Sequence, residues 1–235
     1  MAKVAARAEI ESLLRARQLD RTLTSVAPWH TSRHDDDPAS TGVPSLDAML
    51  AGGFRRGHLS ELVGPRSSGR TTVMCQVLAS AAARGEAVAL VDTCDRFDPA
   101  SAEASGLDLS KLLWIRETGD APRALKAAML VLQAGGFGVV VFDLADVRVT
   151  ALREFPFTTW LRLARVIEGS ATVALLVGSQ HLGRSPGGVT VTFEPMPGLS
   201  RARWAGASHR ARLFDGVELR ARMVGGQCVS RPTTI

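Results

Sequence analysis

The segment from Gly64 to Thr72 is the part of the sequence whose residue types and spacing point most directly to chemistry. It reads Gly-Pro-Arg-Ser-Ser-Gly-Arg-Thr-Thr and matches the phosphate-binding pattern G-x-x-x-x-G-K-[ST] at every fixed position except one. Glycines permit a tight turn, backbone N–H groups cradle phosphates, and the N-terminus of a following helix attracts an anion. We therefore expect a nucleotide site formed by Gly64, Ser67, Ser68, Gly69, Arg70, Thr71 and Thr72.

Arg70 stands where the pattern has lysine. A lysine ammonium is compact and fits between phosphate oxygens, whereas a guanidinium is planar, larger and fixed in its donor directions. We expect this change to permit nucleotide binding but to slow hydrolysis. A strand-to-helix connection that binds no nucleotide is the alternative.

Asp143 supplies the second part of such a site, because it ends the apolar run Val-Val-Val-Phe. An acidic residue there and the hydroxyl of Thr71 would hold Mg²⁺ if a nucleotide binds. No other metal is expected. Cys75, Cys94 and Cys228 are scattered and form no CxxC pair, so neither zinc nor a disulfide framework is indicated.

Alternating apolar strands and helices surround these residues. The pattern predicts strands at 59–64, 87–92, 112–116, 138–143 and 172–179, and helices at 71–85, 99–106, 121–135 and about 150–168. Continuous Val and Leu runs are typical of strands that are buried on both faces. The sequence therefore predicts an α/β fold with a mostly parallel sheet between two layers of helices.

The two ends of the chain have a different character. Residues 1–28 predict an amphipathic helix that docks on another subunit or partner, or else frays, and residues 29–40 read as a polar linker. Residues 41–195 form the expected core. Residues 196–235 form the expected C-terminal tail. Antiparallel edge strands are predicted at 189–193, just before the tail, and at 216–224 within it.

Positive charge is concentrated in residues 196–235. They hold seven arginines against Asp215 and Glu218, so this tail accounts for the whole net charge of +5. We expect contact with single-stranded DNA or with an acidic protein partner through Arg201, Arg203, Trp204, Arg210 and Arg212. A merely solvated charge run is the alternative.

No apolar run is long enough to cross a bilayer, and the first twenty residues contain no signal-type apolar region. With only three cysteines, these features predict a location in the reducing cytoplasm without membrane contact.

The stretch from Ser40 to Asp146 resembles the core of the RecA recombinases. The resemblance rests on STGVPSLD, GPRSSGRTT, VDTCDRFDP and VVVFD, which occur in that order. It implies a RecA-like P-loop core that binds ATP and Mg²⁺ between protomers on single-stranded DNA. It also implies that Gln180 senses the terminal phosphate.

Two positions depart from that family. Cys94 stands where the family has its catalytic glutamate, and Asp95 follows it as a weak substitute. A thiol cannot replace the carboxylate that activates water at neutral pH. The DNA-binding loops are also shorter, so that only the Gly-rich segment 183–188 remains where a mobile loop is expected. With Arg70 also altered, we predict no catalytic residues and an ATP/Mg²⁺ site that is weak or absent.

A short RecA relative with these losses is similar to the ImuA family of inducible-mutagenesis accessory proteins. This similarity implies a role in translesion synthesis during the SOS response to DNA damage. The implied partners are an ImuB-type Y-family polymerase homologue, an error-prone replicative-type polymerase and RecA. An active DNA-dependent ATPase and a damage-response cell-division inhibitor are the alternatives.

Overall fold

The computed structural model describes residues 37–194, 202–205, 213–217, 220–224 and 233–234. All of them belong to the unit Thr31–Ile235, one of two compact units of the chain. The expected N-terminal helix at 1–28 and most of the linker at 29–40 lie outside these residues. Their predicted docking role therefore stays a prediction.

The described residues form nine strands of four to six residues and seven helical segments. The strands are β1 Leu59–Val63, β2 Val88–Asp92, β3 Leu112–Arg116, β4 Val139–Asp143, β5 Val173–Gly178, β6 Thr190–Glu194, β7 Ala202–Ala205, β8 Leu213–Val217 and β9 Arg220–Val224. The helices are α2 Pro44–Met49, α3 Arg70–Ala83, α4 Pro99–Ala104, the 3₁₀ turn η2 Leu109–Lys111, α5 Ala121–Ala134, α6 Val149–Arg153 and α7 Phe157–Ile167. A two-residue strand, β10 Thr233–Thr234, follows.

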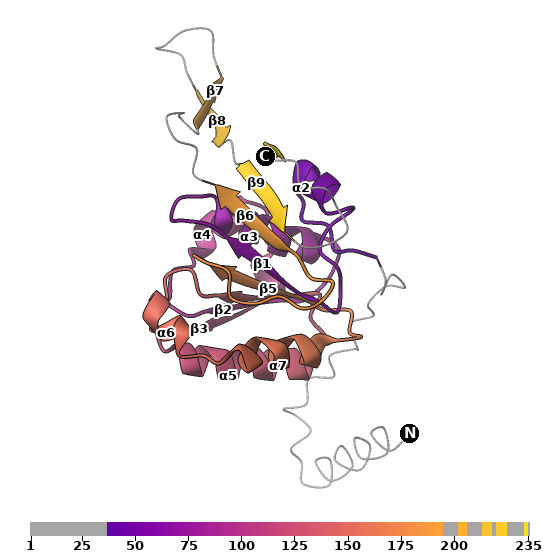
Figure 1. The fold of residues 1–235 in the computed structure, drawn as a ribbon. Coiled ribbons are helices and arrows are strands. Elements are labelled where there is room, and N and C mark those ends of the chain that lie inside the picture. Colours follow the sequence, from indigo (N-terminus) through magenta and orange to yellow (C-terminus); the bar gives the residue numbers. More distant parts are fainter. Residues whose placement is uncertain (1–36, 195–201, 206–212, 218–219, 225–232, 235) are drawn as a thin grey trace, which may run out of the picture. The chain divides into compact units, whose positions relative to one another are not determined.

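Eight of the strands form one sheet in the order β10-β9-β6-β1-β5-β4-β2-β3 (Figure 1). The pairs from β6 to β3 are parallel, whereas β9 pairs antiparallel with β6 and with β10. The mostly parallel sheet with antiparallel C-terminal edge strands is thus confirmed. Two details were wrong: β6 is an interior strand parallel to β1, and the single strand expected at 216–224 is two strands, β8 and β9.

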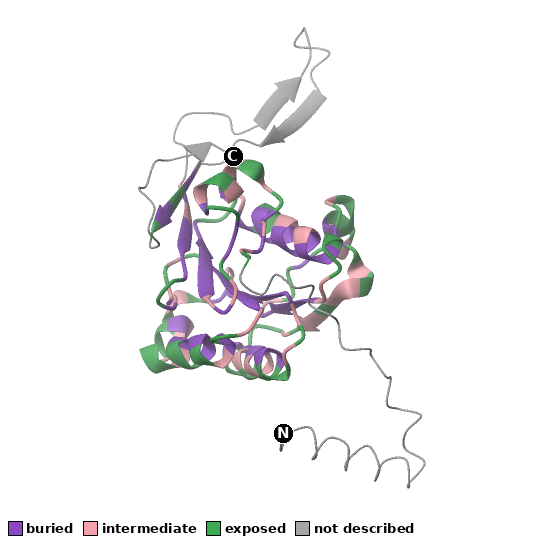
Figure 2. Ribbon diagram, turned by 90° about the vertical axis from the view of Figure 1, so that its right-hand side faces the viewer, coloured by how far each residue is buried: buried purple, intermediate pink, exposed green. Residues whose placement is uncertain are grey.

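Helices cover both faces of the sheet. Alternate side chains of each strand point to opposite faces, so Val139 and Val141 pack with α3 while Val140 and Phe142 pack with α5 and α7. Figure 2 shows buried residues along the central strands and exposed residues on the outer sides of the helices. The predicted arrangement of a sheet between two helix layers is therefore confirmed.

The helix expected at about 150–168 is interrupted. Pro156 has φ −63° and ψ 147°, so its backbone is extended, and α7 begins at the next residue. Proline has no N–H to donate to a preceding helical turn, and its ring disfavours helical geometry in the residue before it. The apolar periodicity on both sides hid this break.

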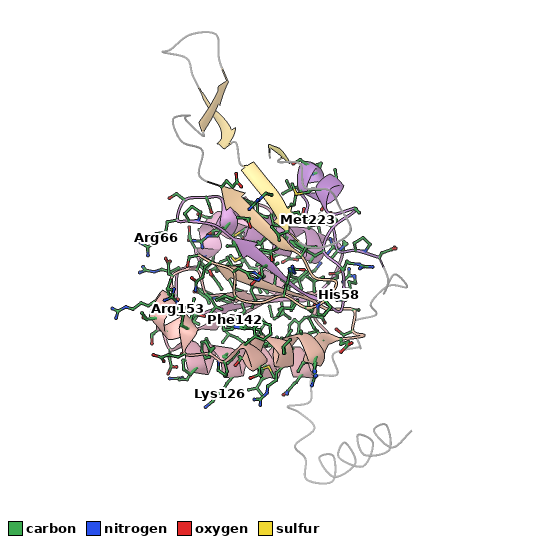
Figure 3. All side chains as sticks on the ribbon, in the orientation of Figure 1. His58, Arg66, Lys126, Phe142, Arg153 and Met223 are labelled. Carbon is green, nitrogen blue, oxygen red and sulfur yellow. The ribbon has the colours of Figure 1, made fainter. Side chains whose placement is uncertain are left out.

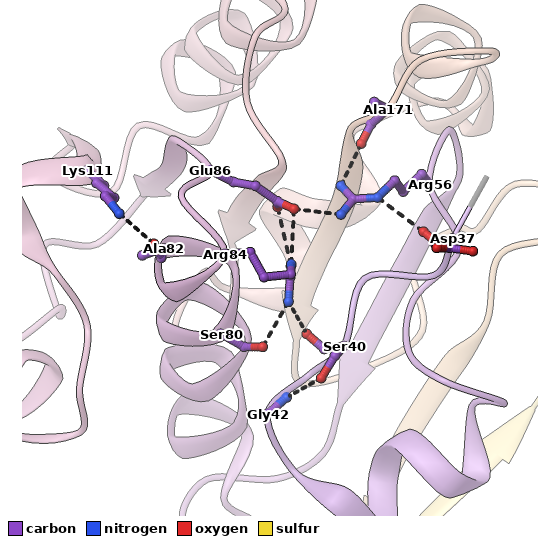
Figure 4. A network of polar contacts seen from close by, with 10 residues as sticks. All are labelled: Asp37, Ser40, Gly42, Arg56, Ser80, Ala82, Arg84, Glu86, Lys111 and Ala171. Atoms are coloured by element: carbon purple, nitrogen blue, oxygen red, sulfur yellow. Dashed lines mark hydrogen bonds and ion pairs between the residues drawn. The ribbon is translucent and has the colours of Figure 1, made fainter. Parts of the chain in front are cut away.

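A partly buried ion-pair network ties the start of the described chain to the sheet (Figure 4). Glu86 accepts hydrogen bonds from Arg56 at 2.6 Å and from Arg84 at 3.0 Å, and Arg84 also donates to the carbonyl oxygen of Ser40 at 3.1 Å. Burial alone would raise the pKa of Glu86, but hydrogen bonds from Arg84 and Arg56 hold it below its ordinary value. The carboxylate stays charged and fixes the segment that leads toward β1.

Candidate nucleotide site

The loop between β1 and α3 has the conformation that its glycines permit. Gly69 is the N-cap of α3 with φ 91°, a left-handed geometry that favours glycine. A Cβ atom at Gly64 would lie 2.7 Å from Ser68 Oγ and 2.9 Å from the carbonyl oxygen of Phe193, so a larger residue does not fit there. The loop therefore leads directly into a fourteen-residue helix whose N-terminus faces the site.

A cleft of about 420 Å³ opens beside this loop. Its lining combines the phosphate loop with the segments that follow β2 and β4. The lining residues are Arg66, Ser67, Arg70, Thr71, Met74, Arg96, Phe97, Asp143, Ala145 and Asp146. The cleft thus brings together four of the predicted residues: Ser67, Arg70, Thr71 and Asp143.

Arg70 is the central cation of the cleft. Arg70 is only 6% exposed, and its Nη1 atom has no hydrogen-bond partner. Burial lowers the pKa of Arg70, and the nearby carboxylates of Asp143 and Asp146 oppose that shift. Ser68, also buried in the loop, has an unpartnered Oγ. Unpaired buried polar atoms are costly, so Arg70, which lines the cleft, has an unused donor that suits an anion such as phosphate. Ser68 does not itself line the cleft.

Asp143 supplies a carboxylate at the carboxyl end of β4. Its Oδ1 accepts a hydrogen bond of 2.9 Å from the backbone N–H of Ala145. Burial raises the pKa of Asp143 to about 6, and the negative charges of Asp92 and Asp146 add to the rise while Arg70 opposes it. At neutral pH the group is mostly ionised, which suits a divalent cation.

The residues present fit a nucleotide phosphate with Mg²⁺. Arg70 and Ser68 have unpartnered polar atoms, and α3 presents its N-terminus. Thr71 is exposed in the cleft beside Asp143, and these are the oxygen ligands that Mg²⁺ prefers. Hydrolysis would also need a group that activates water, and the family resemblance placed that group at the position of Cys94.

Cys94 and Asp95 do not provide that group. Burial raises the pKa of the Cys94 thiol, and the charges of Asp146 and Asp143 raise it further, so the thiol is protonated at neutral pH. Asp95 has φ 55°, and its carboxylate accepts two hydrogen bonds of 2.8 Å from Arg116. Neither residue lines the cleft.

Five predicted residues do not line the cleft: the loop residues Gly64, Ser68 and Gly69, together with Thr72 and Gln180. Thr72 is exposed on the first turn of α3, and Gln180 follows the end of β5, but neither is among the cleft-lining residues. Arg201, Arg210 and Arg212 lie outside the described residues. Arg203 and Trp204 lie on β7, and their side chains lie outside the description as well.

The Gly-rich segment 183–188 is tied to β1. The backbone N–H groups of Leu182 and Gly183 donate to the carboxylate of Glu61 at 2.8 and 2.6 Å, and the Thr190 hydroxyl donates to it at 2.8 Å. His181 also contacts this carboxylate. Glu61 is only 1% exposed. The loop expected to be a mobile DNA-binding element is therefore anchored on a buried carboxyl group.

Three charged cleft residues had no role in the sequence prediction: Arg66, Arg96 and Asp146. Asp146 accepts a hydrogen bond from Arg66 at 2.8 Å and lies 3.9 Å from Arg96. Asp92 places Arg96 by accepting a hydrogen bond of 3.0 Å from its backbone N–H. Asp146 follows Asp143 by three residues, and this spacing could have predicted that both lie at the carboxyl end of β4.

The fold and the cleft together define an α/β protein of the phosphate-loop class. A profile of the RecA N-terminal domain family matches residues 22–153, which is more than half of the chain. The chain belongs to this family.

Relatives and solved structures agree with that membership. A RecA protein of Clostridium acetobutylicum is 39% identical over 108 residues, which cover 46% of this chain and 31% of that protein. A RecA protein of Lactobacillus delbrueckii subsp. bulgaricus is 34% identical over 148 residues, covering 61% of this chain and 44% of that protein. The chain therefore spans less than half the length of these relatives.

The crystal structure of the RadB recombinase shares the fold. It matches with a TM-score of 0.53 and 20% identity, over 77% of this chain and 94% of that structure. Among the described residues, no helix is long and apolar enough to span a bilayer. In the same part of the chain, no cluster of three or more His, Cys, Asp or Glu could hold a metal ion.

Proposed function

We propose that this chain is a cytoplasmic, RecA-family accessory protein of the ImuA type that binds nucleotide with Mg²⁺ but hydrolyses it slowly or not at all. In this role it scaffolds the polymerases of DNA-damage-induced translesion synthesis. Its partners are an ImuB-type Y-family polymerase homologue and an error-prone replicative-type polymerase, together with RecA or single-stranded DNA.

One observation carries the nucleotide part of the proposal. Arg70 lines the cleft and keeps an unpartnered donor for phosphate, whereas the position of the water-activating carboxylate is held by the protonated thiol of Cys94. Asp95, the neighbouring carboxylate, is paired with Arg116. Binding without turnover is what this combination supports.

The translesion part rests on sequence features rather than on the cleft. In its short DNA-binding loops and its Arg-rich residues 196–235, the sequence is similar to the ImuA family of accessory proteins. A scaffold needs surfaces for partners more than it needs turnover.

Phosphate release with and without single-stranded DNA tests the nucleotide part. We expect a rate near background for the parent and for Arg70→Ala, but nucleotide affinity about tenfold or more weaker for Arg70→Ala, because the buried donor is lost. A robust DNA-dependent rate that Arg70→Ala abolishes would show an active ATPase instead. The double change Arg70→Lys with Cys94→Glu should raise turnover, since it restores both departures.

Recovery of partners from DNA-damaged cells tests the translesion part. We expect polymerase components to co-purify with the full chain after damage. Recovery of division-site proteins in their place would favour the cell-division inhibitor.

A further inference from the structure

Three large apolar side chains are exposed on the helix layer formed by α5 and α7. Phe157 is 63% exposed, Leu161 is 38% exposed and Leu130 on α5 is 67% exposed. Phe157 and Leu161 are four residues apart, so they lie next to each other on the outer surface of α7. The row that packs α7 on the sheet is a different one, formed by Trp160, Leu163, Ala164 and Ile167. The exposed pair is therefore not needed to hold the helix in place.

Four exposed cations lie on α7 and on the neighbouring helices α5 and α6. Arg162 and Arg165 lie on the exposed side of α7, Arg153 ends the preceding helix α6, and Lys126 lies on α5. None of the four makes an ion pair with any residue in the described part of the chain. Figure 3 shows Lys126 and Arg153 pointing away from the body of the protein. The four cations outnumber the flanking carboxylates.

Those flanking carboxylates are Glu154 and Glu168, one on each side of α7. The surface thus has an apolar centre about 6 Å long, one helical turn, and a rim with an excess of positive charge. Such a surface is complementary to an acidic segment that carries its own apolar anchors, because apolar contact supplies affinity while charge sets orientation.

We propose that this face of α7, with Leu130 of α5 and the cations of α5, α6 and α7, docks an acidic amphipathic segment of a partner protein. The segment would place large apolar side chains one helical turn apart on Phe157 and Leu161, with Asp and Glu facing Arg162 and Arg165. The proposal rests on the proposed scaffold function, for which it names the chemistry of one partner. It assigns that partner to the core and not to the Arg-rich tail.

A nucleic acid fits this face less well. Phosphate contacts need cations in a track, and stacking on bases needs aromatic faces, of which Phe157 is the one large exposed aromatic in the described residues. A lipid surface fits less well too. Helices that lie in membranes bury a wide apolar face, whereas the wide apolar face of α7 is already buried on the sheet.

A labelled peptide tests the proposal by fluorescence anisotropy on the full chain. The probe is a helix-forming peptide of about 18 residues with Leu and Phe at three- and four-residue spacing and Glu or Asp elsewhere; its control carries Lys at every acidic position. We expect the acidic peptide to bind and the control peptide not to bind. Phe157→Ser with Leu161→Ser should weaken binding about tenfold or more. Arg162→Glu with Arg165→Glu should weaken it by a similar factor and remove its salt dependence.

The matched control is Arg210→Ala with Arg212→Ala, which removes two tail cations and should leave peptide affinity unchanged. The proposal is overturned by absence of binding to the parent chain, by loss only in the tail variant, or by equal binding of both peptides. It is also overturned if oligothymidylate or phosphatidylglycerol vesicles, and not the peptide, lose affinity in the α7 variants. Nucleotide binding is measured on the same variants to separate the nucleotide site from the docking surface. If no nucleotide binds, the nucleotide site is refuted and the peptide result still stands.

Discussion

Arg116 holds the carboxylate of Asp95 through two hydrogen bonds of 2.8 Å, one from Nε and one from Nη2. The guanidinium also lies over the ring of Trp114, 4.6 Å from its centroid. Bidentate pairing and stacking both fix the direction of the side chains. Asp95 is therefore held at the β3 edge of the sheet and not at the cleft.

The first prediction concerns this pair. Arg116→Ala frees Asp95 but leaves its backbone at φ 55°, so we expect phosphate release to stay at the parent level. Steady-state hydrolysis with single-stranded DNA measures it, with Arg123→Ala as a control for loss of a nearby surface arginine. A clear rise in the Arg116→Ala rate would mean that Asp95 can act as the missing base.

Asp143 predicts how stability depends on pH. Its pKa is about 6 in the folded protein, above the ordinary value of 3.8, so between these values the folded state binds more protons than the unfolded state. The stabilising contribution of Asp143 to the free energy of unfolding is fully present below the ordinary pKa and is lost as pH rises through the folded pKa. Asp143→Asn removes this loss. As pH rises from about 4 to about 7, the free energy of unfolding of Asp143→Asn should therefore increase by about 1 to 3 kcal/mol relative to that of the parent.

Urea unfolding in the presence of a metal chelator measures this gain. Asp98→Asn is a control of opposite sign, because a hydrogen bond from Ser101 lowers the pKa of Asp98 and its contribution is lost as pH falls. Equal pH dependence in the parent and in Asp143→Asn would contradict the assignment.

Glu61 predicts which contact holds the loop after β5. Glu61→Ala leaves the N–H groups of Leu182 and Gly183 and the hydroxyl of Thr190 without their acceptor. At about 1 to 3 kcal/mol for each unsatisfied buried group, we expect a loss of at least about 3 kcal/mol in the free energy of unfolding. Amide exchange in residues 181–189 should accelerate as well.

Glu194→Ala is the matched control for Glu61→Ala. Glu194 is half exposed and lies 3.5 Å from Arg222, so its removal should cost less than about 1 kcal/mol. If the two substitutions cost the same, the buried carboxylate is not the anchor of the loop.

The order of strands and helices could be read from the sequence because buried parallel strands leave continuous apolar runs. β3 matches its predicted bounds, and β2, β4 and β5 differ by a residue at one or both ends. The parallel pairing of β6 could not be read, since alternation shows that a strand has two different faces but does not show its neighbours.

The site was predictable where the signal is local. The loop from Gly64 to Thr71 and the strand-end Asp143 are short-range patterns, and the structure brings Ser67, Arg70, Thr71 and Asp143 to one cleft. The contact of Glu61 with His181 spans 120 residues of sequence, and no local pattern reports it. Asp95 looked like a free carboxylate for the same reason, because it lies in the turn after β2 whereas its partner Arg116 is at the end of β3.

Residues 196–235 give a prediction of their own. Arg210→Ala with Arg212→Ala should weaken binding to single-stranded DNA uniformly across sequences and reduce the slope of affinity against salt by about 1 to 2, if these arginines contact phosphates. Titration of a labelled oligonucleotide at several salt concentrations measures both. Unchanged DNA binding together with loss of a polymerase partner would assign the tail to protein docking.

Single-turnover chemistry on bound ATP tests the central claim most directly. Excess protein is mixed with labelled ATP, Mg²⁺ and single-stranded DNA, and bound nucleotide and released phosphate are followed in the same sample. We predict saturable binding that Arg70→Ala weakens, with nearly all bound nucleotide recovered as ATP over many minutes. Conversion of bound ATP to ADP within seconds, or absence of binding at any concentration, would contradict a site that binds nucleotide without turning it over.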